Sequence, residues 1–245
     1  VNLADSLVNL DGDSKGTNDL LFYRRVGTAL TLEVIYGGPL LPRNLNLVDQ
    51  TLSASSAIKH VVYTITVGSN SNLQVFGLNW FGNTKSDFAI FEDPISSGTN
   101  GSSVLTIYGG STLPVTNSAL SLAFRPNFSG PLDLVNYHAA GIGDYNGDGR
   151  DDVAINSHAN GWIITGGSPF NNNFTTIPKT FLAQQVNPNR KQNTFALGDI
   201  GRSQTVGGTT NVSNIPDGYD DFATVSTVNA NSQADQLISV YLGST

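Results

Sequence analysis

One short segment of the chain concentrates the side chains that could do chemistry. Asp144-Tyr-Asn-Gly-Asp-Gly-Arg-Asp-Asp152 places side-chain oxygens at relative positions 1, 3, 5 and 9, and a backbone carbonyl at position 7. Several hard oxygen ligands within one tight loop suit Ca²⁺, and Gly147 and Gly149 permit the positive φ angles that such a loop requires. We therefore expect a calcium site whose ligands are Asp144, Asn146, Asp148, the carbonyl of Arg150, and Asp152.

The loop differs from an EF-hand. An EF-hand needs a bidentate Glu at position 12 and a helix on each side, whereas position 12 here is Ile155, inside an alternating strand that begins at Asp152. Mg²⁺ fits less well than Ca²⁺, because it demands a strict octahedron and keeps several waters. The alternative is a plain turn rich in Asp and Asn that binds no metal.

The elements around this loop recur along the chain. Four segments share one plan: a short apolar strand, a loop rich in Asp, Asn and Gly, an aspartate that opens a second strand, and a third strand that ends in a glycine turn. The strand-opening aspartates are Asp19, Asp87, Asp152 and Asp221, which lie 68, 65 and 69 residues apart. A period of this length holds about four strands with their connections. Candidate fourth strands fall between the repeats, at 59–67, 119–124 and 179–183.

The repetition predicts an all-β fold in which residues 1–245 form a single β-propeller region. Its four blades, of about four antiparallel strands each, would span approximately 1–67, 68–125, 126–186 and 187–245, and we number these repeats 1 to 4. Propeller blades pack face to face around an axis. A lone four-stranded sheet cannot bury both of its faces, which argues against a string of separate small sheets.

The loop and the strand after it resemble a known repeat. The pattern Gly143-Asp-x-Asn-Gly-Asp-Gly-x-x-Asp152-hydrophobic-Ala154 resembles the FG-GAP repeat, which is the blade unit of the integrin alpha-chain β-propeller and of many bacterial secreted proteins. The resemblance implies that the loop joins the first and second strands of a blade and holds one Ca²⁺. It also implies an extracellular location, secreted or at the cell surface, and it allows the four repeats to be part of a larger, seven-bladed propeller.

The other three loops match this pattern to different degrees. In repeat 1, the ligand places fall on Asn9, Asp11, Asp13 and Asp19, and we expect metal there. In repeat 2, they fall on Asn79, Phe81, Asn83 and Asp87, which leaves one carboxylate, and we expect no metal. In repeat 4, Asp199, Asp217 and Asp221 match, but an insertion at 201–216 replaces the asparagine. Metal binding in repeat 4 then depends on an oxygen from that insertion.

Composition and the remaining motifs exclude several functions. The net charge of −7 without a basic stripe argues against a nucleic-acid partner, and no apolar run approaches the roughly 18 residues of a membrane-spanning helix. Neither a nucleophile elbow, nor a P-loop, nor a zinc pattern is present. The three histidines, His60, His138 and His158, have no metal-like spacing, so we expect the chain not to be an enzyme.

Two kinds of function fit these features. The first is a binding or adhesion module that holds a protein or glycan ligand through its long loops. The second is a structural segment of a larger cell-surface or filament-forming protein; a non-catalytic propeller of a secreted polysaccharide-degrading enzyme is a further alternative. The fourth repeat ends after its third strand, which predicts an open edge along 235–241 and head-to-tail self-association through it.

Overall fold

All regular structure in the described residues of the chain is β-strand. The computed structural model describes residues 2–3, 10, 18–37, 60–94, 104–109, 138–156, 161–167, 174–176, 193–200, 202–206, 209–230 and 233–243. These residues form sixteen strands, every pairing is antiparallel, and no helix occurs among them. None of them therefore belongs to a helix that could cross a membrane. The predicted all-β fold is confirmed.

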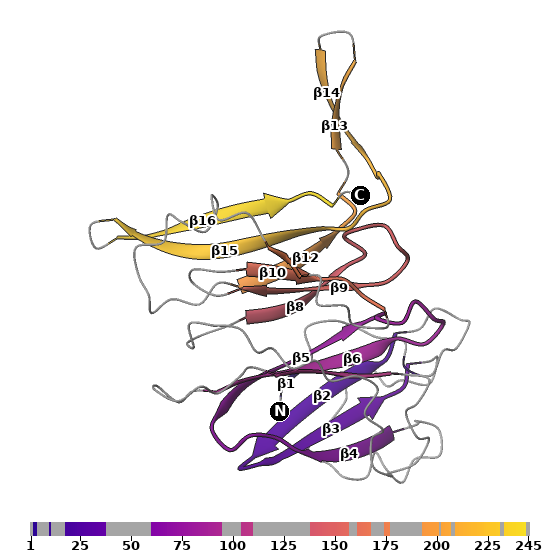
Figure 1. Cartoon of the computed structure of the whole chain (residues 1–245), viewed down its shortest axis with the longest axis vertical. Coiled ribbons are helices and arrows are strands. Elements are labelled where there is room, and N and C mark those ends of the chain that lie inside the picture. Colours follow the sequence, from indigo (N-terminus) through magenta and orange to yellow (C-terminus); the bar gives the residue numbers. More distant parts are fainter. Residues whose placement is uncertain are drawn as a thin grey trace.

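Each repeat contributes one meandering sheet whose strands pair in chain order (Figure 1). Repeat 1 has β1 (Asn2–Leu3), β2 (Leu20–Val26), β3 (Ala29–Ile35) and β4 (His60–Thr66). Repeat 2 has β5 (Ser71–Leu78), β6 (Asp87–Pro94) and β7 (Val104–Tyr108). Repeat 3 has β8 (His138–Gly143), β9 (Asp152–Asn156), β10 (Gly161–Ile164) and β11 (Phe174–Thr176). Repeat 4 has β12 (Asn193–Gly198), β15 (Asp221–Ala230) and β16 (Gln233–Tyr241).

The structure differs from the sequence-based expectation at one insertion and leaves three expected strands undescribed. The strand expected to lead into Leu10 lies outside the described residues, and the strand described before it is β1 at Asn2–Leu3. The fourth strand described in repeat 3 is β11. The insertion at 201–216, expected to be a loop, forms the hairpin of β13 (Arg202–Val206) and β14 (Thr209–Ile215). The expected strands at 119–124 and 179–183 lie outside the described residues, whereas β4 confirms the one at 59–67.

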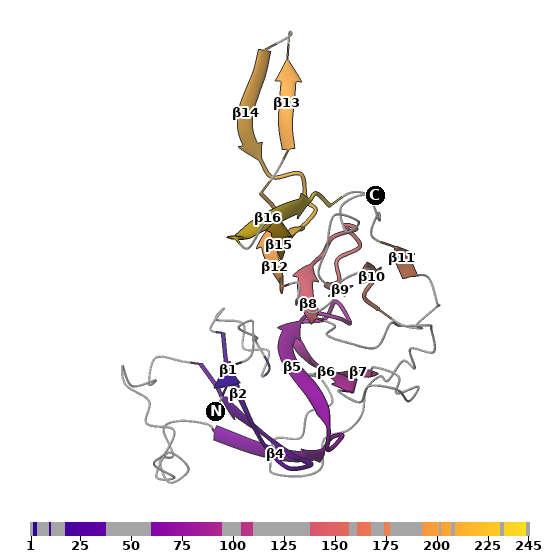
Figure 2. The ribbon, with the colours of Figure 1, turned by 90° about the vertical axis from the view of Figure 1, so that its left-hand side faces the viewer.

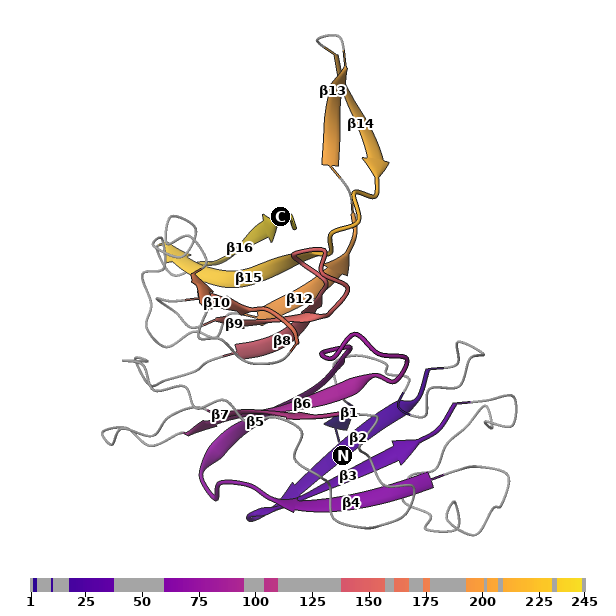
Figure 3. The same ribbon diagram turned by 45° about the vertical axis from the view of Figure 1, so that its right-hand side comes forward.

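The four sheets follow one another in a row, with repeat 1 at one end and repeat 4 at the other (Figures 1 and 3). Three clusters of buried apolar side chains join them, one at each boundary between successive repeats. Successive side chains of a strand point to opposite faces of its sheet, so one strand can contribute side chains to two clusters. On β6, Phe88 and Ile90 belong to the cluster shared with repeat 1, while Ala89 and Phe91 belong to the cluster shared with repeat 3.

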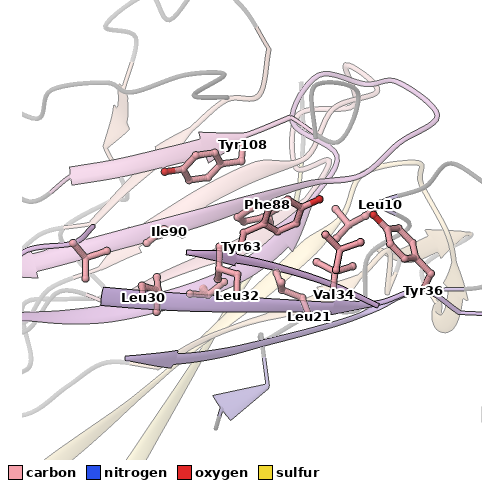
Figure 4. Close-up of a cluster of buried hydrophobic side chains, with 13 residues drawn as sticks. Leu10, Leu21, Leu30, Leu32, Val34, Tyr36, Tyr63, Phe88, Ile90 and Tyr108 are labelled. Atoms are coloured by element: carbon pink, nitrogen blue, oxygen red, sulfur yellow. The ribbon is translucent and has the colours of Figure 1, made fainter. Parts of the chain in front are cut away.

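The largest cluster joins repeats 1 and 2. Figure 4 shows Leu21 and Leu32 of repeat 1 facing the side chains of repeat 2. Phe88 and Tyr108 stack there with ring centroids 5.1 Å apart. Burial of these side chains accounts for the stacking of the sheets, because each sheet alone leaves an apolar face in water.

The loops that carry the acidic residues gather at the same side of this row. Figure 3 places the β5–β6 and β8–β9 connections on neighbouring sheets at one side of the molecule. The β13–β14 hairpin arises from the corresponding connection of repeat 4 and extends away from all the sheets (Figure 2). The fold thus brings the corresponding loops of repeats 2, 3 and 4 to one side of the row.

Candidate metal centre

The four strand-opening aspartates are buried and hold the same structural position. Asp19, Asp87, Asp152 and Asp221 are each at most 2% exposed. In three of them, one carboxylate oxygen accepts the N–H of the glycine that follows the third strand: Gly37 in repeat 1 (2.7 Å), Gly166 in repeat 3 (2.8 Å) and Gly243 in repeat 4 (2.8 Å). The aspartate therefore ties the second strand to the end of the third.

The other carboxylate oxygen of each aspartate holds the start of the loop. It accepts the N–H of the residue at loop position 2 in three repeats: Leu10 (2.6 Å), Tyr145 (3.0 Å) and Ile200 (3.0 Å). In repeat 2, Asp87 Oδ2 accepts instead the N–H of Phe81 at position 3 (3.0 Å). These bonds satisfy backbone groups that would otherwise be buried without partners, so the residue expected at ligand position 9 is also a structural element of every repeat.

The loop of repeat 3 is closed by its own acidic side chains. The carboxylate of Asp144 accepts the N–H groups of Asp148 (2.9 Å) and Gly149 (2.7 Å). Asn146 Oδ1 accepts the N–H of Asp148 (3.0 Å), and Asp148 Oδ1 accepts that of Arg150 (3.0 Å). Gly147 and Gly149 have φ angles of 73° and 84°, as expected for a tight wrap. The predicted side-chain ligands of this repeat are thus brought into one loop.

Negative charge accumulates in this loop. The pKa of Asp152 is raised to about 7, chiefly by burial and further by the nearby carboxylates of Asp148 and Asp144, against the opposing effect of the N–H bonds from Gly166 and Tyr145. Burial also raises the pKa of the neighbouring Asp151. A hard divalent cation would compensate this charge.

The donor set fits calcium in kind, although the side chains are engaged with backbone amides. Asp144, Asn146, Asp148 and Asp152 offer oxygen only, and the loop supplies carbonyl groups between them, as Ca²⁺ sites do. Among the described residues, no three Asp, Glu or His side chains converge closely enough to hold a metal ion as they stand. Ligation would therefore require these carboxylates to exchange some of their N–H partners for the cation.

The loop of repeat 4 reproduces this closure despite its insertion. Asp199 accepts the N–H groups of Asp217 (3.1 Å) and Gly218 (2.7 Å), and Asp217 Oδ1 accepts that of Tyr219 (3.2 Å). Gly218 has a φ of 86°, close to that of Gly149. The bonding matches Asp199 to Asp144 and Asp217 to Asp148. Positions 1, 5 and 9 are therefore acidic in both loops, and the hairpin emerges between positions 1 and 5.

The loop of repeat 2 has similar backbone hydrogen bonds but no acidic residue at position 1 or position 5. Asn83 Oδ1 accepts the N–H of Lys85 (2.9 Å), as Asp148 accepts that of Arg150. The Arg150 side chain of repeat 3 lies against this loop, since an added Cβ on Gly82 would be 3.0 Å from Arg150 Cγ. In repeat 1, only Leu10 and Asp19 of the loop and its closing strand enter this comparison, and Asn9, Asp11 and Asp13 lie outside the described residues.

Two residues missed by the sequence reasoning join successive repeats. Asp151 accepts the N–H of Asn79 at Oδ2 (2.6 Å) and donates its own N–H to the Asn79 carbonyl (3.0 Å). Asp220 makes the same pair of bonds with Asp144, at 2.8 and 2.9 Å. Each residue directly precedes a strand-opening aspartate, so the doublets Asp151-Asp152 and Asp220-Asp221 were the available signal.

We call the contact between two successive repeats a joint. Glycine is required where the backbones at a joint come closest. An added Cβ on Gly166 would lie 2.5 Å from the carbonyl oxygen of Asp151 and 3.2 Å from that of Trp80 in the preceding repeat. On Gly243, it would lie 2.5 Å from the Asp220 carbonyl and 2.7 Å from that of Tyr145. The third-strand glycine therefore has a packing role as well as its bond to the aspartate.

The one histidine whose side-chain bonding is described belongs to a joint rather than to a reactive cluster. His138 Nδ1 accepts the N–H of Thr194 (3.3 Å), which links β8 to β12. Gln74 has the same role in the preceding joint, where its Oε1 accepts the N–H of Ala139 (2.6 Å). Both side chains connect the first strands of successive sheets.

No protein-family model matches the chain, and neither a curated protein nor a solved structure matches it. Function is therefore inferred from the geometry of the repeats and their loops.

Proposed function

We propose that the chain is a calcium-binding module of β-propeller type in which the loop of repeat 3 holds Ca²⁺. The observation that carries this proposal is the closure of one loop by the side-chain oxygens of Asp144, Asn146, Asp148 and Asp152, with a raised Asp152 pKa. Four meandering sheets that pack face to face support the blade arrangement. The FG-GAP-like pattern supports the ligand assignment.

Further calcium sites follow from the same pattern. Asp199, Asp217 and Asp221 supply three carboxylates in repeat 4 with a closure like that of repeat 3. In repeat 1, the sequence supplies three carboxylates, Asp11, Asp13 and Asp19, and the amide oxygen of Asn9. Extracellular modules of this kind bind Ca²⁺ in the range of about 10⁻⁴–10⁻³ M, which agrees with a secreted or cell-surface protein.

The module would act by binding a protein or glycan rather than by catalysis. The β13–β14 hairpin extends from the side on which the loops of repeats 2 and 3 lie, so it presents backbone edges to a ligand (Figure 2). His138, a proton carrier by residue type, is engaged with a backbone amide between sheets. A calcium-stabilised frame with a projecting hairpin suits recognition.

Calorimetric titration of chelator-stripped protein with Ca²⁺ tests the metal assignment. We expect at least two sites and the loss of one in Asp148→Ala. Asn83→Ala is the matched control, because Asn83 holds the same place in the loop of repeat 2 and makes the same bond; it should lose none. A chain that binds no Ca²⁺, or an Asp148→Ala variant with undiminished stoichiometry, would refute the proposal.

A structural role in a larger assembly is the second candidate. Among the described strands, β16 pairs only with β15, which agrees with the predicted open edge. Several apolar side chains of repeat 4 are also exposed. These features call for a partner independently of calcium.

A further inference from the structure

Repeat 4 carries an apolar sheet face that no described residue of another repeat covers. Phe195 on β12 and Val240 on β16 are each 50% exposed, and Ile238 is 62% exposed. The strand register pairs Phe195 with Ala223 and Ala223 with Val240, so these three residues form one row across the sheet. Contiguous exposed apolar surface of this kind marks an interaction site.

The corresponding row is buried in repeats 2 and 3. Phe76, Ala89 and Ile107 form it in repeat 2 and pack against repeat 3. Ala154 and Ile163 belong to it in repeat 3 and pack against repeat 4. The row of repeat 4 therefore has the composition of an internal joint, although no described repeat packs against it.

Loop position 2 shows the same contrast. Leu10 and Trp80 occupy it in repeats 1 and 2 and are buried in the clusters shared with the next repeat. Tyr145 occupies it in repeat 3 and makes an edge-to-face contact with Phe222 of repeat 4, with ring centroids 5.5 Å apart. Ile200 occupies it in repeat 4 and is 40% exposed. Both the apolar row and the residue at loop position 2 are thus exposed on repeat 4, whereas the corresponding residues of the other repeats pack against the next repeat.

Repeat 1 carries the counterpart on its outer face. The residue after each strand-opening aspartate packs against the preceding repeat: Phe88, Val153 and Phe222 are all buried in this way. Leu20 holds this place in repeat 1, where it is half-buried, and Phe22 two residues later is half-buried as well.

Repeat 1 also has a residue that could make the polar contact found at the internal joints. Asp151 and Asp220 accept an N–H from the preceding repeat. Asn18 holds the same place before Asp19, is exposed, and offers an amide oxygen that can accept the same kind of bond. The outer face of repeat 1 therefore combines an acceptor with the apolar side chains of Leu20, Phe22 and Ile35, of which Ile35 is already fully buried.

We propose that the exposed face of repeat 4 binds the outer face of repeat 1 in a second copy of this chain. The contact would repeat the internal joint head to tail, and it is heterologous, so it closes into a ring or continues as a filament. The rows of repeat 4 that enter it contain no charged residue at 193, 195, 197, 223, 225, 238, 240 or 242. Burying these rows requires no charged side chain of repeat 4 to lose its hydration, although Glu33 lies beside Phe22 on the repeat 1 face.

A mixing experiment with two variants tests this contact. Phe195→Glu damages the repeat 4 face and Phe22→Glu damages the repeat 1 face, so each variant alone should be monomeric by sedimentation at concentrations where the unchanged chain associates. Association should weaken more than about tenfold, as for large apolar residues central to an interface. An equimolar mixture should form dimers that grow no further, because one intact face of each kind remains. Dimer formation also shows that both variants are folded.

Thr84→Glu is the matched control, since Thr84 is exposed in the loop of repeat 2 and lies outside both faces. It should associate as the unchanged chain does. The proposal is overturned if the unchanged chain is monomeric at every concentration, or if the mixture stays monomeric. It is equally overturned if Phe195→Glu still associates, because the open edge of β16 would then carry the contact.

Discussion

The loops of repeats 2 and 3 share a backbone frame and differ in charge. In both, a buried aspartate accepts an N–H from the loop start, and the side chain at position 5 accepts the N–H at position 7. Repeat 3 adds carboxylates at positions 1 and 5, where repeat 2 has Asn79 and Asn83. The comparison separates the groups that build a repeat from the groups that would bind metal.

The largest expected effect concerns the buried aspartates. Asp87→Ala and Asp152→Ala should each lower the free energy of unfolding by about 3 kcal/mol, because each removes a buried acceptor: that of the Phe81 N–H in repeat 2, and that of the Gly166, Tyr145 and Asn146 N–H groups in repeat 3. Urea unfolding in the presence of a chelator measures this. Equal losses in the two repeats would show that the aspartate is structural in both. A loss confined to Asp152→Ala would instead give Asp152 a role that Asp87 lacks.

Replacing the third-strand glycine should have a smaller effect. In Gly166→Ala, the new Cβ would lie 2.5 Å from the carbonyl oxygen of Asp151, and overpacking of this kind costs about 1–3 kcal/mol. Thermal unfolding should show the decrease with and without Ca²⁺. Gly68→Ala is the matched control, because Gly68 has no left-handed φ and its added Cβ would come no closer than 3.4 Å to a neighbouring side chain; a greater loss there would contradict the packing argument.

Giving the repeat 2 loop the side chains of repeat 3 should create an additional metal site. The triple variant Asn79→Asp, Phe81→Asn, Asn83→Asp gives the repeat 2 loop the side chains of repeat 3 at positions 1, 3 and 5. Calorimetry should detect one additional Ca²⁺, and the melting temperature should rise with Ca²⁺ by more than in the unchanged chain. A site filled to one hundred times its Kd adds about 2.7 kcal/mol. Unchanged stoichiometry would mean that the frame of repeat 2 cannot bind metal.

The smallest expected effect is Asp151→Asn. The amide keeps an oxygen that can accept the Asn79 N–H, so the free energy of unfolding should change by less than about 1 kcal/mol. Asp151→Ala removes the acceptor and should cost more, about 1.5–3 kcal/mol for a bond to a charged group. Chemical denaturation of both variants provides the measurement. If Asn and Ala are equally destabilising, the bond to Asn79 does not stabilise the joint.

The sequence predicted the elements that repeat locally. The strand-opening aspartates, the glycine-containing loop at 144–152 and the short apolar strands each have a pattern within a few residues, and the structure contains them. The hairpin at 202–215 was missed, because its many Thr, Ser and Asn residues resemble a loop in composition although its two strands form an antiparallel pair.

The joints could not be predicted because they connect distant residues. Asn79 and Asp151 are 72 positions apart, and Asp144 and Asp220 are 76 apart. No local periodicity encodes such a pair; only the alignment of one repeat with the next would reveal it. Arg150 shows the same limit: its place in the loop suggested a carbonyl ligand, whereas the position of its side chain against Gly82 depends on how two sheets pack.

The closure of the repeat 4 loop around its hairpin makes this connection a permissive insertion point. Asp199 binds the backbone of Asp217 and Gly218, so the two ends of the inserted segment are held together wherever the segment itself leads. Doubling the length of a flexible segment between fixed ends costs only about 0.6 kcal/mol of closure entropy. Foreign peptides placed between β13 and β14 could therefore vary in length and sequence while the sheets beneath keep their packing, as a display scaffold requires.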